Sequence, residues 1–320
     1  MLLWGAVFVV AVAFLVMSAG WFTEGAEELG IHLGVPSYLV GVTIVAIGTS
    51  LPELVSSVIA VLRGSPEIVM GNVVGSNIAN IFLVLGFAAI IGRTLTVTYE
   101  IIHVDLPTLV ASAFFVAVAA WDGIVSRGEG VILIAGAVVY MAYAVNIAKQ
   151  RGRIHEDIDE SLRKELKIEK GELDPWTWPR IAGGAVVIFF AANYTVESVI
   201  ELSKILKIGT EVIAVSAVAI GTSLPELAVS SVAAKRGNLE VAMGNVLGST
   251  IFNSFIVLGI PAVIADVPAP PAILTLGLPV MIIATLLYFF MAQDREITRW
   301  EGWLLVLFYV LFLGKLFELI

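Results

Sequence analysis

The sequence predicts an all-α polytopic membrane protein with ten transmembrane helices, arranged as two inverted five-helix repeats with broken core helices. Three observations lead to this prediction: the composition, the spacing of the apolar segments and an internal repeat. The chain has 320 residues, of which 59% are hydrophobic and only 14% are charged. Soluble domains average about 45–50% apolar and about 25% charged residues, so a soluble protein of this size could not bury so much apolar surface.

Ten apolar segments follow one another, each close to the ~20 residues that a helix needs to cross a bilayer. Met1 leads directly into the first segment without a basic stretch, so we expect a retained membrane helix and not a cleaved signal peptide. All seven tryptophans lie near segment ends, as in an aromatic belt: Trp4, Trp21, Trp121, Trp176, Trp178, Trp300 and Trp303. The segments cover residues 2–22, 37–62, 68–91, 104–121, 129–149, 179–200, 209–234, 239–263, 270–292 and 298–318.

The longest polar stretch divides the chain into two halves. We expect a first five-helix repeat over residues 1–149, a cytoplasmic linker over 150–177 and a second five-helix repeat over 178–320. Of the 18 Lys and Arg residues, 13 fall in loops on the same side of the membrane as this linker. The positive-inside rule assigns that side to the cytoplasm, which predicts that both termini are extracellular. The expected location is the cell membrane (plasma or inner), with the lipid bilayer as surroundings and no obligate protein partner.

The strongest signal is self-similarity between the halves. Residues 41–86 align without a gap to residues 214–259, and 28 of the 46 positions are identical. Each half holds five segments, and because five is odd the two copies enter the membrane in opposite directions. A purely structural duplication would need to keep only the apolar pattern, whereas here the polar residues are kept too, and these are costly in lipid.

Both copies contain the motif G-T-S-L-P-E in the middle of an apolar segment, at residues 48–53 and 221–226. Proline lacks an N–H group and clashes with the preceding turn, so we expect the helices to break near Thr49–Ser50 and Thr222–Ser223. A break at membrane depth is tolerated only where the backbone faces protein or a wet cavity. The freed carbonyl groups then become candidate ion ligands.

The glutamates of this motif, Glu53 and Glu226, have two interpretations. In a capping box, Ser50 would cap the downstream helix and Glu53 would bond back to it. However, a carboxylate at the bilayer centre costs about 3 kcal/mol or more, and glutamine would cap as well. Two symmetric acids therefore favour a site for a charged ligand.

A second shared motif, G-N-V-[VL]-G-S-x-I-x-N, opens the following segment at residues 71–80 and 244–253. The spacing of four places three polar side chains on one helix face in each half: Asn72, Ser76 and Asn80 in the first, and Asn245, Ser249 and Asn253 in the second. Such residues also hold close-packed helices together, and this alternative applies most to Asn72 and Asn245.

Carboxylate, hydroxyl and carbonyl oxygens form the kind of hard site that suits Ca²⁺ and Na⁺. Two negative charges balance one Ca²⁺, two Na⁺ or two H⁺. The chain has no cysteine, which excludes disulfides and thiolate metal sites, and its net charge of −9 argues against a nucleic-acid partner. No resident cofactor is expected.

At these motifs the chain resembles the Ca²⁺/cation antiporter superfamily, and within it the ten-helix prokaryotic Na⁺/Ca²⁺ exchangers of the K⁺-independent type. The resemblance covers nearly the whole chain. It implies that Glu53 and Glu226 are the main ion ligands and that Thr49 and Thr222 supply backbone oxygens to Ca²⁺. It also implies three further pairs: the carbonyl groups of Ala46 and Ala219 with the hydroxyls of Ser76 and Ser249 for Na⁺, Asn80 and Asn253 at the centre, and Ser50 and Ser223 close by.

The resemblance further implies Na⁺ for Ca²⁺ exchange by alternating access, normally with extrusion of Ca²⁺. K⁺-dependent relatives carry Asp at the position of Asn253, and H⁺-coupled relatives carry an acid three residues after the position of Asn72, where this chain has Gly75. H⁺/Ca²⁺ exchange or transport of another divalent cation remains the alternative. An intramembrane enzyme or a cation channel is disfavoured, because the chain lacks an HExxH motif and its inverted repeats are typical of carriers.

Overall fold

The computed structural model describes residues 2–32, 46–92, 94–96, 105–152, 173–207, 209–235, 239–294 and 296–318. Within these residues, helical segments occupy all ten of the positions expected from the sequence, and seven helices are long and apolar enough to cross a membrane. Two further helices, Leu51–Leu62 and Leu106–Ala119, are apolar but shorter. The chain is therefore a multi-pass, all-α membrane protein.

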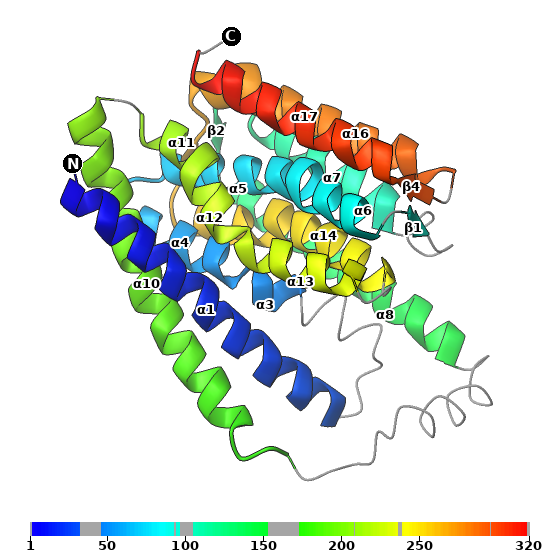
Figure 1. Ribbon diagram of the computed structural model, residues 1–320. Coiled ribbons are helices and arrows are strands. Elements are labelled where there is room, and N and C mark those ends of the chain that lie inside the picture. Colours follow the sequence, from blue (N-terminus) through cyan, green and yellow to red (C-terminus); the bar gives the residue numbers. More distant parts are fainter. Residues whose placement is uncertain are drawn as a thin grey trace.

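Each half contributes five helical segments, several of them composed of consecutive pieces (Figure 1). The helices of the first half are α1 (Leu2–His32), α3 (Ala46–Thr49), α4 (Leu51–Leu62), α5 (Glu67–Ala79), the π-helix η2 (Asn80–Leu85), α6 (Gly86–Gly92), α7 (Leu106–Ala119) and α8 (Arg127–Gly152). The second half begins with α10 (Thr177–Leu206), α11 (Thr210–Ile213), the π-helix η4 (Ala214–Val218), α12 (Ala219–Thr222) and α13 (Leu224–Lys235). It continues with α14 (Leu239–Phe252), η5 (Asn253–Val257), α15 (Gly259–Ile264), η6 (Ile273–Gly277), α16 (Leu278–Ala292) and α17 (Arg299–Leu316).

Two short antiparallel strand pairs display the symmetry of the repeat. Strand β1 (Thr94–Thr96) pairs with β4 (Glu296–Thr298), and β2 (Ile124–Val125) pairs with β3 (Val267–Pro268). The offset between the repeats is 173 residues, as Glu53 and Glu226 show (226 − 53 = 173). This offset carries the pair Thr94–Thr298 onto the pair Val267–Val125, and both pairs occur in the structure. The strand pairing therefore obeys the two-fold relation that the sequence repeat predicts.

Glycine contacts between helices follow nearly the same relation, with Gly130 one residue away from the position equivalent to Gly302 (302 − 173 = 129). Gly86 of α6 packs against Gly302 of α17, and the repeat equivalent of Gly86, Gly259 of α15, packs against Gly130 of α8. A Cβ atom built on any of these four glycines would lie 3.1 Å or less from the backbone oxygen of its partner. Each contact thus requires a residue without a side chain, so that the helix backbones can approach closely.

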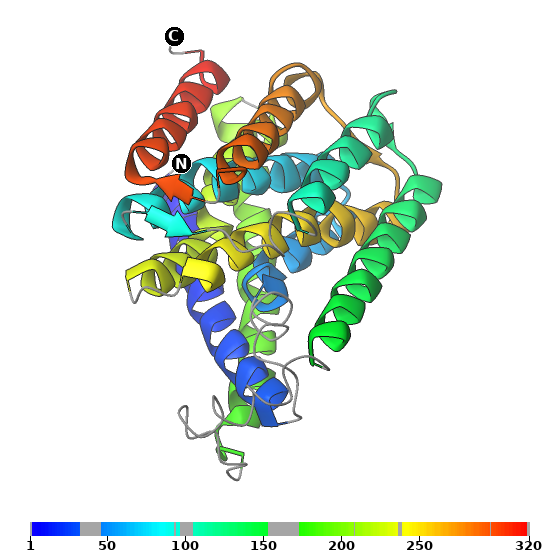
Figure 2. The same cartoon turned by 90° about the vertical axis from the view of Figure 1, so that its right-hand side faces the viewer.

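Helices α1 and α10 form a long antiparallel pair along one side of the molecule (Figures 1 and 2). They run further than the expected segments 2–22 and 179–200, and the 30 residues of α10 correspond to about 45 Å of helix. At one end of the pair, a polar contact joins the parts of the two helices that lie beyond the apolar runs. Glu28 of α1 accepts hydrogen bonds from the Thr177 hydroxyl at 2.7 Å and from the backbone N–H of Asp174 at 3.1 Å. A carboxylate in this position stabilises the N-terminus of α10.

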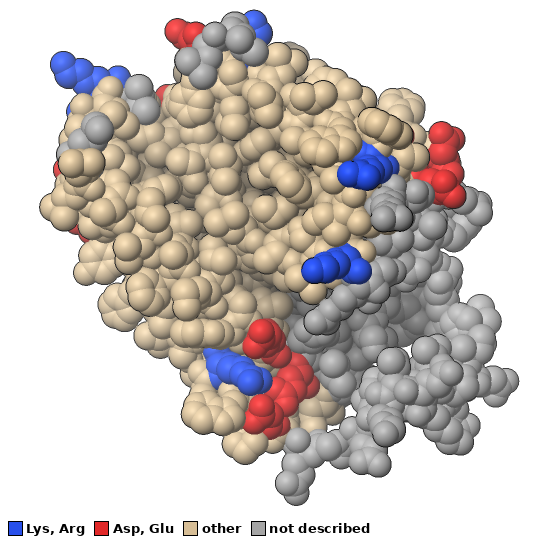
Figure 3. Space-filling model, in the orientation of Figure 1, with Lys and Arg blue, Asp and Glu red and all other residues tan. Residues whose placement is uncertain are grey.

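The outer surface is apolar over a broad area. Figure 3 shows one face with a broad uncharged area, around whose margin the side chains of Lys, Arg, Asp and Glu gather. Large hydrophobic side chains are exposed on several helices, including Leu2, Val118 and Trp300. Exposed apolar surface of this extent is expected for helices that face lipid.

Parts of three predictions lie outside the described residues. These parts are residues 37–45 of the second apolar segment, residues 41–45 of the first repeat motif and residues 153–172 of the predicted linker.

Candidate ion-binding site

The two predicted helix breaks are present at Ser50 and Ser223. Ser50 lies between α3 and α4 with φ −90° and ψ 6°, and Ser223 lies between α12 and α13 with φ −83° and ψ 5°. Two residues later, Pro52 and Pro225 offer no N–H group to the carbonyl four residues before them. Each break therefore frees the carbonyl of the motif glycine at the centre of an otherwise apolar segment.

The breaks place the two motif glutamates inside the protein. Glu53 and Glu226 are each 0% exposed and lie in the first turn of α4 and α13, respectively. One carboxylate oxygen of each is hydrogen-bonded, whereas Oε2 of each has no hydrogen-bond partner in the described part of the chain. Buried carboxylate oxygens without a partner are rare, and they indicate a place for a cation.

The capping-box interpretation of Ser50 is wrong, because the structure shows no side-chain hydrogen bond that caps α4. Instead, Ser50 Oγ donates a hydrogen bond to Oε1 of Glu226 in the other repeat at 3.1 Å. Glu53 accepts a longer bond, 3.5 Å, from Ser76 Oγ of its own repeat. The motif serine thus connects the two halves rather than closing its own helix.

Further contacts join the G-T-S-L-P-E motif of the first repeat to the G-N-V-[VL]-G-S-x-I-x-N motif of the second repeat. Thr49 Oγ1 lies 3.3 Å from Ser249 Oγ and donates to Asn245 Oδ1 at 3.3 Å. Ser249 Oγ also donates to the carbonyl oxygen of Ala46 at 3.5 Å. Thr222 Oγ1 donates to the carbonyl oxygen of Val218, one turn earlier in its own repeat, at 3.0 Å. Oxygen atoms from both repeats therefore form one buried cluster, which we call the chamber.

Asn80 and Asn253 are fully buried, and neither amide group has a hydrogen-bond partner among the described residues. Each is the first residue of a π-helix, η2 and η5. Widened turns of this kind occur often at functional sites. These π-helices could not be predicted from the sequence, because one extra residue in a turn leaves the apolar pattern almost unchanged.

Asn72 and Asn245 act mainly as helix connectors. Asn72 Nδ2 donates to the carbonyl of Glu53 at 3.1 Å and to Ser57 Oγ at 3.0 Å. Asn245 makes the equivalent bonds to Glu226 at 3.3 Å and to Ser230 at 3.0 Å. These contacts agree with the structural alternative given for both asparagines, and they fix the turn that carries each glutamate.

Gly71 and Gly75 of α5 are positioning residues that the sequence analysis did not single out. A Cβ atom at Gly75 would lie 2.5 Å from the carbonyl oxygen of Val215, and one at Gly71 would lie 2.7 Å from that of Glu211. Helix α5 therefore touches the backbone of the opposite repeat. The four-residue spacing of these glycines, repeated at Gly244 and Gly248, is a signal that could have revealed the contact.

The chemical character of the chamber follows from its ligands. Among the described residues, no group of three or more His, Cys, Asp or Glu side chains could hold a metal ion. The chamber instead combines two carboxylates with neutral hydroxyl, amide and carbonyl oxygens. Such a set suits hard cations that must be released again, since fewer charged ligands give weaker binding.

Comparison with known proteins agrees with this geometry. The sequence profile of the sodium/calcium exchanger protein family matches residues 3–146 and 176–317. The chain belongs to this family. It is 32% identical over 297 residues to the inner membrane protein YrbG of Escherichia coli (strain K12), covering 92% of this chain and 90% of the relative. It is also 32% identical to the sodium/calcium exchanger MaX1 of Methanosarcina acetivorans, and the match covers 97% of each protein.

The fold of this family member is similar to solved structures of the sodium-calcium exchanger NCX_Mj. One of these, obtained with Na⁺ and Sr²⁺, superimposes with a TM-score of 0.67 at 30% sequence identity and covers 97% of each chain. The predicted ten-helix architecture with inverted repeats is the architecture of this fold.

Proposed function

We propose that this family member is a secondary active antiporter that exchanges Na⁺ for Ca²⁺ through the chamber between its two repeats. The observation that carries the proposal is the pair of fully buried glutamates at the helix breaks, Glu53 and Glu226, each with one oxygen that has no hydrogen-bond partner among the described residues. A charged pair of this kind is costly in a membrane protein unless it serves an ion pathway.

Charge balance explains how one chamber serves two ions. Two carboxylates neutralise one Ca²⁺ or two Na⁺, so the chamber accepts either set in turn. In the proposal, the carboxylates of Glu53 and Glu226 and the carbonyl groups of Thr49 and Thr222 bind Ca²⁺. The neutral oxygens for Na⁺ come from Ala46, Ala219, Ser76 and Ser249, while Asn80 and Asn253 line the centre.

Helix α1 is placed to control access to the chamber. It packs against both motif glycines, with Thr23 on Gly48 and Val12 on Gly221. A movement of α1 along its axis, together with its partner α10, would uncover one break and cover the other. We propose that this sliding provides alternating access, with α4, α5, α13 and α14 as the ion-binding core.

The proposed setting is the cell membrane, with both termini outside as the distribution of Lys and Arg predicts. There the inward Na⁺ gradient would drive Ca²⁺ out of the cell. Membership in a family of exchangers supports a carrier rather than an enzyme.

The test is uptake of ⁴⁵Ca²⁺ into proteoliposomes that are loaded with Na⁺ and diluted into Na⁺-free buffer. Choline-loaded vesicles serve as the control, and a third set carries an imposed pH gradient. Uptake that requires internal Na⁺ is the expected result. Uptake driven only by the pH gradient would replace Na⁺ by H⁺ as the coupling ion, and uptake without any counter-ion would indicate a channel.

A further inference from the structure

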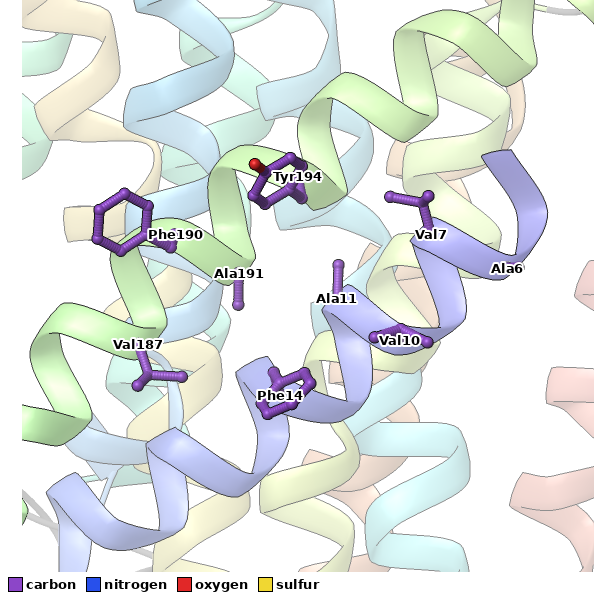
Figure 4. A pocket seen from close by; sticks show the side chains of 9 residues that line it. All are labelled: Ala6, Val7, Val10, Ala11, Phe14, Val187, Phe190, Ala191 and Tyr194. Carbon is purple, nitrogen blue, oxygen red and sulfur yellow. The ribbon is translucent and has the colours of Figure 1, made fainter. Parts of the chain in front are cut away.

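An apolar groove with a volume of about 540 Å³ lies between α1 and α10 (Figure 4) and shares no lining residue with the ion chamber. Phe14 of α1 and Phe190 and Tyr194 of α10 form its walls. Ala11 and Ala191 point into the space between the helices, and their small side chains leave the groove open (Figure 4). Every other lining side chain is apolar too, and the single polar group is the hydroxyl of Tyr194.

The groove continues to one end of the helix pair. A second apolar hollow of about 620 Å³ shares Ala6 and Val10 with the first and extends to Leu2 and Leu202. From Phe14 to Leu2 the groove follows α1 for about 18 Å, at 1.5 Å of rise per residue. One leaflet of the hydrocarbon core, half of about 30 Å, has nearly the same depth. The groove is therefore about as long as a single leaflet is deep.

The position of the groove identifies the chemistry of its occupant. Both walls belong to membrane-spanning helices, so the surrounding molecules are lipids. Basic side chains follow the end of the groove at Leu202. Lys204 is paired with Glu201 at 2.6 Å, whereas Lys207 makes no ion pair within the described part of the chain. One positive charge is thus left at headgroup level, where lysine side chains favour an anionic phosphate.

We propose that this groove binds a phospholipid with an anionic headgroup, its acyl chain lying between α1 and α10 and its phosphate at Lys207. The site is connected to the ion chamber through one helix. Ala11 lines the groove, and the next residue, Val12, packs against Gly221 at the break of the second repeat. A bound chain holds α1 at a fixed distance from α10, and so at a fixed position over the break. This last consequence depends on the proposed exchange activity, whereas lipid binding does not.

Native mass spectrometry of the purified full chain tests the binding. After removal of lipid, phosphatidylglycerol or phosphatidylcholine with the same acyl chains is added. The variant Ala6→Phe fills the groove from an exposed position, and Ala182→Phe adds the same ring to an exposed position of α10 outside it. We expect wild type and Ala182→Phe to retain one phosphatidylglycerol and Ala6→Phe to lose at least tenfold in occupancy.

The headgroup contact has its own variant. Lys207→Gln should reduce the retention of phosphatidylglycerol to that of phosphatidylcholine, while Lys315→Gln, a substitution at an exposed lysine of α17, should leave the preference intact. Circular dichroism and size-exclusion chromatography verify that each variant is folded.

Equal retention of phosphatidylglycerol by wild type and Ala6→Phe would overturn the groove as the site. Equal retention of the two lipids by wild type would overturn the anionic headgroup. A wild-type dimer that Ala6→Phe dissociates would assign the groove to a second copy of the chain and overturn the lipid.

Discussion

The two halves of the ion chamber carry the same side chains but make different contacts. Ser50 of the first repeat is bonded to Glu226 at 3.1 Å, whereas its equivalent, Ser223, has no hydrogen-bond partner in the described residues. Ser249 reaches the carbonyl of Ala46, while its equivalent, Ser76, bonds to Glu53 instead. The sequence is nearly two-fold symmetric here, but the conformation is not.

The proposed alternating access between inverted repeats accounts for this difference. Two copies in opposite orientations can exchange their conformations, and the exchanged state opens toward the other side of the membrane. In that state Ser223 would bond to Glu53, and Ser50 would lose its partner. Under the proposed alternating access, the asymmetry corresponds to one of two equivalent arrangements of the same chamber, and variants of equivalent residues can test this.

The largest effect is expected for the glutamates, where the two halves should behave alike. Glu53→Gln or Glu226→Gln removes one charge from a buried cluster, a loss of about 3–5 kcal/mol when a buried charge is left without its partner. Because about 1.4 kcal/mol corresponds to a factor of ten, Na⁺-dependent Ca²⁺ uptake should fall by at least about 100-fold in either variant. Unchanged elution in size-exclusion chromatography would show that insertion is intact. Normal uptake in either variant would contradict a site that needs both carboxylates.

Gly75→Ala should weaken the contact between the repeats. The new Cβ atom would lie 2.5 Å from the backbone oxygen of Val215, so α5 must move away from the opposite repeat. Overpacking of this kind costs about 1–3 kcal/mol, which thermal unfolding in detergent can measure. Gly183→Ala is the matched control, since nothing lies within 4 Å of its added Cβ atom. An unchanged melting temperature for Gly75→Ala would show that the two repeats do not need this close approach.

Variants of the two motif serines are expected to affect Ca²⁺ binding from opposite sides of the membrane. Ser50→Ala removes a hydrogen bond to a carboxylate in the present conformation, and such bonds contribute about 1.5–3 kcal/mol. We expect its apparent KM for Ca²⁺ to rise at least about tenfold on one side of oriented vesicles only. Ser223→Ala should have the same effect on the opposite side. Equal changes on both sides for each variant would refute the exchange of contacts between the repeats.

Variants of the two central asparagines are expected to change the KM for Ca²⁺ to a similar degree, and this is the smallest of the expected effects. Neither Asn80 nor Asn253 has a hydrogen-bond partner among the described residues, so each amide is free to contribute one neutral oxygen. Loss of such an oxygen is expected to cost about 1 kcal/mol. Asn80→Ala and Asn253→Ala should therefore raise the KM for Ca²⁺ by about fivefold, and to a similar degree. A large difference between the two variants would mean that the centre is asymmetric as well.

Some features of the site could be predicted because they depend on local chemistry. Pro52 and Pro225 break their helices wherever the segments lie, since the missing N–H group is a property of the residue. A buried glutamate in each break followed from the apolar segments around it. The ends of α1 and α10 could not be predicted in the same way, because the contact of Glu28 with Thr177 joins residues that are far apart in the chain.

The sequence by itself determined the ten helical segments, the inverted repeat, the two breaks and the acids that they carry. Hydrophobicity, proline geometry and residue identity act locally, so they can be read along the chain. Only the tertiary structure decided that Ser50 bonds to Glu226, that the π-helices begin at Asn80 and Asn253, and that α1 covers both breaks. These features depend on packing between the repeats, and two copies of nearly the same sequence cannot specify which one adopts which conformation.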